Sequence, residues 1–462
     1  MQAALEERSL ASFFERSKDF HVGRRQPRFA ETQPNDPIAE TLAAQLCQAA
    51  QLAKQNPQPV LDFLRSVSQL VDKPGYAQVG ADLADFSVGI LNQASQAMPE
   101  AEILALQVHL SAANHLGERH LADPIWEQYI QREEQLKELG LRGLELMAEM
   151  RNRRAISRLD QFCFDEAKII LAYILTHVEQ GLESLARMFN VSAAQLPTRL
   201  IGTLYGTLGQ IYALQSEPDH RRAEECFRKA LGFFTVPEDR QRQWVYLGHL
   251  ACDQGEQGRA LWQEVCAELP DLTSLSPIAE EGKQYVLALQ IKGQYVFGTL
   301  ADILAFLTNW QNVDLTSAYS APSRQLHPFG LIHQGLGMLY ERAWRETQNI
   351  DYANRALDCY HQAAELMDQG GPVLKVLSRI ARSRRWLVKS ELPGAEERAL
   401  QRLRELFLGL RGYLAEYFGE SAWAEGPDGR SYGHFGRLDP GPAYSWQERT
   451  RAILRAIRFN YW

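Results

Sequence analysis

Apolar residues recur along this chain at intervals of three and four positions, with polar residues between them. Leu42, Leu46, Ala49 and Ala53 follow this spacing, and so do positions 103, 106, 110 and 113. Such spacing places apolar side chains on one face of an α-helix. Alternating apolar and polar positions, which would indicate strands, are hard to find. The pattern therefore predicts an all-α protein.

Breaks rich in proline and glycine, such as QNPQP, VDKPGY and TVPED, interrupt the helical pattern. They leave segments of about 12 to 25 residues, the length of paired helices joined by short turns. Two longer polar segments depart from this rhythm, HVGRRQPRFAETQPNDP and EGPDGRSYGHFGRLDPGPAYSW. We therefore expect four parts: an N-terminal helix and linker (1–36), a helical domain (37–199), helical hairpins (200–390), and C-terminal helices with an irregular segment and a capping helix (391–462).

One stretch, LYGTLGQIYALQSEPDHRRAEECFRKALGFF from Leu204 to Phe234, recurs later in the chain with changes. A Leu-Gly pair and a Tyr are followed by an Ala, an aromatic residue and a second Ala. In the middle copy Glu264 replaces the second aromatic residue. The copies comprise Leu208, Gly209, Tyr212, Ala223, Phe227 and Ala230; then Leu247, Gly248, Ala251, Ala260 and Ala267; then Leu336, Gly337, Tyr340, Ala356, Tyr360 and Ala363.

This pattern resembles the tetratricopeptide (TPR) repeat, in which the first set of residues lies on one helix and the second set on the next. Small residues allow the two helices to approach closely, and the rings fill the gaps between them. The resemblance implies a TPR-like α-solenoid of antiparallel helix hairpins, each burying a face on its neighbour. Residues 37–199 are then either degenerate repeats or a different helical domain.

The resemblance also implies a binding groove for an extended peptide or a helix of a partner protein. In TPR proteins the inner faces of the first helices line that groove. The alternative is that the same residues pack against neighbouring helices of this chain. The resemblance places in the groove Thr203, Gln210, Leu214, Arg242, His249, Asp253, Gln334, Met338 and Arg342.

The composition argues against several classes of protein. The formal net charge of −8 does not suit a generally basic nucleic-acid coat. Six cysteines are scattered without a C-x-x-C pair, which indicates reduced thiols in a cytoplasmic protein and no zinc site. The chain contains no run of about 18 apolar residues and no apolar signal core at its start, so we expect no membrane partner. The oligomeric state stays open.

Arginine-rich clusters occur at 23–28, 151–158, 379–389 and 449–458. In the third cluster Arg382, Arg385 and Lys389 share one face of the predicted helix, next to Trp386. Guanidinium groups suit phosphate and acidic side chains equally well. The acidic surplus elsewhere favours salt bridges, within the chain or with a partner. A nucleic-acid surface is the alternative.

A further segment, LESLARMFNVSAAQLPTRL (182–200), looks like a helix-turn-helix. Pro197 falls inside the helix that would read bases, where it removes a backbone donor. The positions that would face bases also offer few hydrogen-bonding side chains. The sequence therefore favours a tight turn in which Ser192 caps a short helix.

Signatures of catalysis are sparse. The chain contains no glycine-rich phosphate loop, no H-E-x-x-H and no G-x-S-x-G. In RALDCYH, Arg355 and His361 resemble the Arg and His pair of HEPN ribonucleases. We interpret the chain as a non-enzymatic scaffold or regulatory subunit of a larger assembly, without a cofactor or metal, that binds another protein. The alternatives are a regulator that contacts nucleic acid through its arginine patches, and a HEPN-like ribonuclease.

Overall fold

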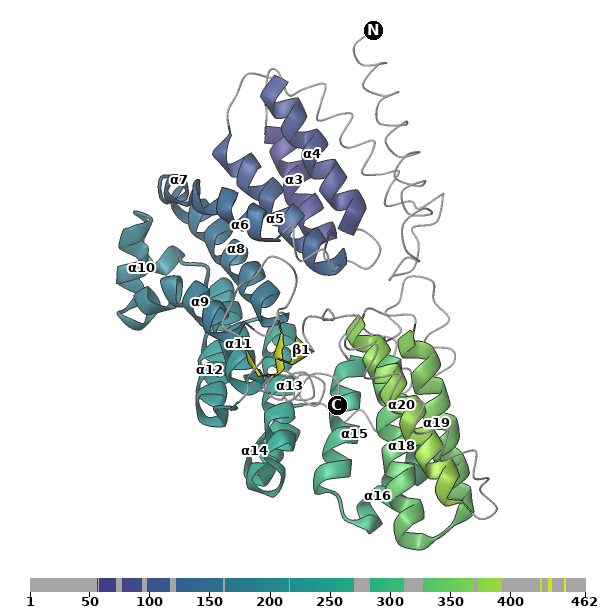
Figure 1. Cartoon of the computed structure of the whole chain (residues 1–462). Coiled ribbons are helices and arrows are strands. Elements are labelled where there is room, and N and C mark those ends of the chain that lie inside the picture. Colours follow the sequence, from purple (N-terminus) through teal and green to yellow (C-terminus); the bar gives the residue numbers. More distant parts are fainter. Residues whose placement is uncertain are drawn as a thin grey trace. The chain divides into compact units, whose positions relative to one another are not determined.

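The structure is a computed structural model of the chain (Figure 1). It divides into two compact units, Met1–Thr207 (unit 1) and Leu208–Trp462 (unit 2), and each is described by itself. The N-terminal helix and linker expected at 1–36 and the expected C-terminal capping helix lie outside the described residues. The structure describes residues 56, 58–71, 77–93, 98–116, 122–160, 163–215, 217–269, 283–310, 327–368, 372–392, 424–425, 431–433 and 444–445.

Unit 1 consists of helices that begin and end at the breaks in the sequence. Helix α5, for example, starts at Pro99, which lacks a backbone donor and is therefore suited to a first turn. Helix α3 packs against α4 and α5, α5 against α8, and α8 against α9. The helices are α3 (Gln58–Leu70), α4 (Ala77–Gln93), α5 (Pro99–Leu116), α6 (Ala122–Ile130), α7 (Glu133–Lys137), α8 (Gly140–Asp160), α9 (Phe164–Glu179) and α10 (Leu182–Met188).

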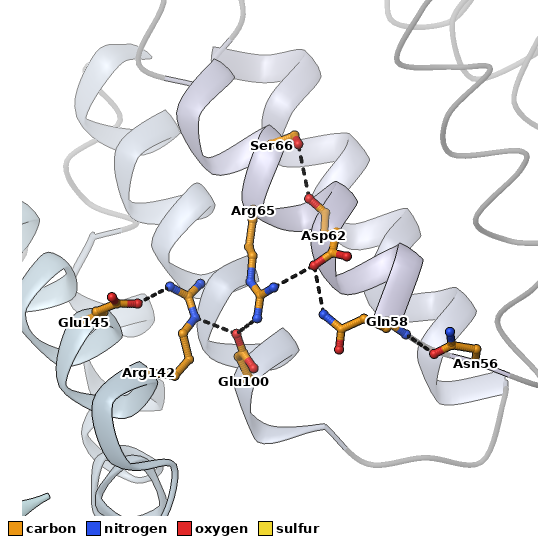
Figure 2. Close-up of polar contacts among 8 residues, drawn as sticks. All are labelled: Asn56, Gln58, Asp62, Arg65, Ser66, Glu100, Arg142 and Glu145. Atoms are coloured by element: carbon orange, nitrogen blue, oxygen red, sulfur yellow. Dashed lines mark hydrogen bonds and ion pairs between the residues drawn. The ribbon is translucent and has the colours of Figure 1, made fainter. Parts of the chain in front are cut away.

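A shared carboxylate joins three of these helices. Glu100 lies in the first turn of α5, and its Oε1 accepts a hydrogen bond of 2.7 Å from Arg65 of α3. The same oxygen accepts a second bond of 2.7 Å from Nε of Arg142 on α8. Figure 2 shows the two guanidinium groups pointing toward Glu100 from different helices. Charge-assisted hydrogen bonds of this kind fix α3 and α8 against the start of α5.

The segment that resembles a helix-turn-helix forms α10, a turn and a short 3-10 helix, η2 (Ala193–Gln195). Asn190 occupies the left-handed region at the turn, with φ of 52°. The backbone N–H of Ser192 donates to Oε1 of Gln195 at 3.1 Å, and the Ser192 hydroxyl donates to the same oxygen at 2.9 Å. The short helix that begins after Ser192 is therefore confirmed. Because Pro197 precedes the next helix, it does not interrupt one.

Unit 2 continues with helices joined mostly by short turns. Helix α11 crosses the division between the units. Asp219 caps α12, because its side chain accepts a hydrogen bond of 3.0 Å from the N–H of Arg222. The helices are α11 (Thr198–Leu214), α12 (His220–Phe233), α13 (Pro237–Gln254), the 3-10 helix η3 (Gly255–Gly258), α14 (Arg259–Glu268), α15 (Lys283–Phe297), α16 (Leu300–Trp310), α18 (His327–Thr347), α19 (Ile350–Asp368) and α20 (Pro372–Glu391).

The order of packing in unit 2 follows the order of the chain. Helix α13 packs against α12, α14 and α15, and α15 packs in turn against α18. Helix α18 packs against α19, and α19 against α20, and these three run side by side in Figure 1. Helices α13, α15 and α18 are thus successive neighbours, although α14 and α16 lie between them in the sequence.

Glycines stand at the closest approaches between these helices, as the sequence predicts. A Cβ atom at Gly209 would lie 2.5 Å from the ring of Phe227 on α12, and one at Gly337 would lie 2.8 Å from the ring of Tyr360 on α19. Both contacts join the first and second helices of one hairpin. A Cβ atom at Gly248 would lie 2.5 Å from Leu289 of α15, so this glycine permits α13 to approach α15 closely.

Helices dominate the described part of the chain, which confirms the all-α expectation in outline. The segment that the sequence leaves irregular also contains three short strands, β1 (Ala424–Glu425), β2 (Ser431–Gly433) and β3 (Tyr444–Ser445). They pair in the order β1-β2-β3, and both pairings are antiparallel. Within the described ranges, no helix has the length and apolar character needed to cross a membrane.

Candidate partner-binding site

The nine residues of the expected groove lie on α11, α13 and α18. Eight of them belong to unit 2, and the helices α13 and α18 that carry six of these eight both pack against α15. Thr203 lies in the part of α11 that belongs to unit 1, where its hydroxyl donates to the carbonyl of Arg199 at 3.0 Å. Helix α15 therefore stands between the two helices that supply most of the predicted residues.

Four of the nine side chains are buried. Leu214 and Gln334 are each 2% exposed, and Met338 is 1% exposed. These three therefore pack within the chain, as the alternative interpretation of the sequence expects. His249 is buried too, and its contacts are polar.

His249 of α13 is paired with a buried lysine of α15. Its Nδ1 lies 3.2 Å from Nζ of Lys292. Burial, together with the positive charge of Lys292, holds the pKa of His249 well below its ordinary value. An ammonium group can only donate, so Nδ1 is the acceptor and the neutral ring carries its proton on Nε2. The pair places a buried polar contact between α13 and α15.

Two further groove residues also make contacts inside unit 2. Asp253 accepts a hydrogen bond of 3.1 Å from Nε2 of His220 on α12. Gln210 is hydrogen-bonded to Tyr246, whose ring stacks on Phe227 with centroids 5.5 Å apart. Burial raises the pKa of the Tyr246 hydroxyl, so it stays protonated at neutral pH. These contacts join α13 to α11 and α12.

The remaining two groove residues are arginines with different surroundings. Arg342 donates from Nε to Glu346 at 2.8 Å and from Nη1 to the carbonyl of Tyr295 at 2.9 Å, so it fastens α18 to α15. Arg242 is the most exposed of the nine. Among the described residues, no carboxylate forms an ion pair with Arg242. Arg242 is thus the groove residue most available to a partner.

The basic patch predicted on α20 has mixed partners. Arg382 pairs with Oδ2 of Asp368 at 3.0 Å, which is the salt bridge that the acidic surplus favours. Nζ of Lys389 lies 5.0 Å from the centroid of the Trp386 ring, within the range of a cation–π contact. Arg385 is half-buried. The structure keeps all three on one helix, beside Trp386 as expected.

The repeat pattern has no copy in α15 and α16, which both pack against α18. A Cβ atom at Gly293 would lie 1.9 Å from the ring of Trp262 on α14, so this glycine also permits a close approach between helices. In the three recognised copies a leucine precedes the glycine, whereas here Lys292 does. No local signal marks this glycine, because the residue that Lys292 contacts, His249, lies on another helix.

The arginine and histidine that resemble the HEPN pair both lie on α19 and are exposed. Nη1 of Arg355 lies 3.4 Å from the hydroxyl of Tyr340, and its guanidinium carbon lies 5.8 Å from the centroid of that ring. Arg355 is therefore held against α18. Comparisons with protein-family models, with curated proteins and with solved structures each find no match for this chain.

Proposed function

We propose that this chain is a non-enzymatic, cytoplasmic scaffold or regulatory subunit that binds a partner protein along α13, α15 and α18. The observation that carries the proposal is the packing of α13 against α15 and of α15 against α18. Stacked hairpins present their successive first helices as one extended surface, which repeat proteins use for binding. The Gly209 and Gly337 contacts, each with a ring on the second helix, support a TPR-like origin for these hairpins.

Arg242 is the proposed anchor for the partner. It is exposed on α13, and arginine is enriched among residues that dominate binding energies. A guanidinium group pairs with a carboxylate through two parallel N–H donors, so a protein partner is expected to present an acidic side chain at this position. The buried residues Leu214, Gln334 and Met338 would then support the helices without touching the partner.

Site-specific crosslinking tests the proposal. A photoreactive phenylalanine analogue at position 242 should capture a defined protein in native extract, which mass spectrometry would identify. The same analogue at Gln263, which is exposed on α14, is the matched control. Binding of the identified protein should be lost in Arg242→Glu and retained in Arg221→Glu, since Arg221 is exposed on α12. Equal capture at both positions, or equal binding by both variants, would contradict the proposal.

Salt dependence separates this proposal from a nucleic-acid surface on α20. Phosphate contacts weaken steeply with salt, because each neutralised phosphate releases counterions. Retention of RNA by the wild-type chain, lost in Arg385→Glu and on raising the salt concentration, would favour the alternative. A complex with a protein partner that persists in moderate salt would favour the scaffold.

A further inference from the structure

Four arginines of α8 form a cluster inside unit 1. Three of them are among the buried charged residues of the chain: Arg151, Arg154 and Arg158 are 6%, 2% and 7% exposed. Arg153 is half-buried and donates from Nη1 to the hydroxyl of Ser111 on α5. Arginine stays protonated at neutral pH, so each buried guanidinium needs acceptors for its donors. We call these four residues the α8 arginine cluster.

Arg151 is a residue of the α8 arginine cluster whose three guanidinium nitrogens all have hydrogen-bond partners. Its Nε and Nη2 each donate to an oxygen of Glu133 at 2.8 Å, and its Nη1 donates to the carbonyl of Ile170 at 3.0 Å. Its guanidinium also lies over the ring of Tyr173, 3.7 Å from the centroid. All three nitrogens of this buried cation therefore have a partner.

Arg154, one turn further along α8, is not satisfied in this way. Its Nη2 donates to Oδ1 of Asp123, but its Nε and Nη1 are covered and have no hydrogen-bond partner. The same Oδ1 also pairs with Arg158 at 3.0 Å, so one carboxylate oxygen serves two guanidinium groups. Leaving buried donors of a charged group without acceptors is costly.

Ser157, three residues after Arg154 on α8, also carries a buried polar atom without a hydrogen-bond partner. Ser157 is 1% exposed, and its Oγ has no hydrogen-bond partner. Residues three apart on a helix project from the same face, so Ser157 and Arg154 lie on one face of α8. One buried face of α8 thus holds two guanidinium nitrogens of Arg154 and a hydroxyl that have no hydrogen-bond partner.

We propose that Nε and Nη1 of Arg154, together with the Ser157 hydroxyl, bind the oxygen atoms of a small oxyanion, a phosphate or a carboxylate. An oxyanion supplies several hydrogen-bond acceptors for the unpaired donors of this face and a negative charge that balances the guanidinium. A guanidinium binds such groups through two parallel N–H donors. The donors are covered, so the anion must be small and must enter while neighbouring side chains move apart. The inference concerns unit 1 and does not depend on the proposed partner-binding surface.

Electrostatics support this assignment. Burial, and after it the nearby charge of Arg158, lower the pKa of Arg154 from its ordinary value. The negative charge of a bound anion would favour the protonated guanidinium and so oppose this lowering. Water could also satisfy the donors, since buried polar groups often bind ordered water. Water would not make stability depend on the anion, and this difference can be measured.

Thermal unfolding of the full chain in matched chloride, acetate and inorganic phosphate, at constant ionic strength, tests the site. The wild-type midpoint should rise with the concentration of phosphate or acetate, because a ligand that binds only the folded state stabilises it. The anion that gives the rise identifies the group as phosphate or carboxylate. Arg154→Met, which keeps an apolar side chain without donors, should lose the rise. Arg221→Met is the matched control, because Arg221 is exposed, and it should keep the rise.

Two further variants keep the test decisive if Arg154→Met fails to fold. Arg154→Lys retains the charge without the paired donors, and Ser157→Ala removes one donor. Each should weaken binding of inorganic phosphate or acetate, measured by calorimetry, at least several-fold. The proposal is overturned if neither anion raises the wild-type midpoint, or if the rise persists unchanged in every variant at 154 and 157.

Discussion

The ring of Tyr360 packs directly against the backbone of Gly337, because a Cβ atom at position 337 would lie 2.8 Å from the ring. An alanine there would force the tyrosine or the backbone to shift. We expect Gly337→Ala to lower the free energy of unfolding by about 1–3 kcal/mol through overpacking. Denaturant unfolding of the wild type and of the variant would measure this difference in free energy.

Gly232 offers the matched control within α12. A Cβ atom there would meet no heavy atom within 4 Å. Gly232→Ala should therefore be neutral or stabilise by up to about 1 kcal/mol, because it lowers the entropy of the unfolded chain. Equal effects of the two substitutions would show that Gly337 is not needed for the close approach.

The glycine contacts show how far the sequence could predict this fold. The Leu-Gly pairs correctly mark Gly209, Gly248 and Gly337 as points of close helix approach. The pattern missed Gly293, because Lys292 precedes it and a lysine does not suggest a buried position. The structure explains Lys292 by its contact with His249, which comes from another helix. A partner so far away in the sequence leaves no local signal.

The sequence could not predict which of the groove residues are exposed, and the reason is related. Helical spacing places Gln334 and Met338 on one face, but the spacing does not say which neighbouring helix covers that face. The structure buries both. The strands of 424–445 were missed because segments of two or three residues are too short to show alternation.

The hydroxyl of Tyr360 makes a buried hydrogen bond, and we predict the effect of removing it. It donates to Oε2 of Glu341 at 2.5 Å, and Glu341 is itself buried. Removing the hydroxyl leaves that oxygen with Arg384 at 3.6 Å, which is beyond hydrogen-bond distance. Tyr360→Phe should therefore cost about 1–3 kcal/mol of stability. Urea titration of the two proteins would measure the difference, and an unchanged midpoint would contradict the role of this bond.

The same tyrosine gives a prediction at alkaline pH. Burial raises the pKa of Tyr360 well above its ordinary value of 10.0, and burial raises the pKa of Tyr129 in the same way. Above pH 10 the unfolded chain loses these protons while the folded chain keeps them, so stability falls as the pH rises. The variants Tyr360→Phe and Tyr129→Phe should each show a shallower fall. A slope identical to that of the wild type would show that neither hydroxyl is responsible.

Two histidines with lowered pKa values predict the opposite dependence at acidic pH. Burial lowers the pKa of His333 to about 4, and burial with Lys292 lowers that of His249. Below about pH 6.5 the unfolded histidines bind protons that the folded ones do not, so stability falls as the pH decreases. His333→Gln should flatten the decline between pH 6.5 and about 4, and His249→Gln should flatten it below pH 6.5. His361→Gln, on the exposed side of α19, should leave it unchanged, and a flattening there would contradict the assignment.

The last prediction concerns Glu100, whose single oxygen accepts from both Arg65 and Arg142. Glu100 is only 14% exposed, so this contact is poorly screened by solvent. Glu100→Gln keeps the shape but removes the charge, and it should cost about 1–3 kcal/mol because both hydrogen bonds involve ions. Glu145→Gln serves as the control. Glu145 is 32% exposed and, among the described residues, forms an ion pair with Arg142 alone, so its loss should cost less than about 1 kcal/mol. If the two substitutions cost the same, the shared oxygen of Glu100 does not join α3 to α8 in the way that the structure indicates.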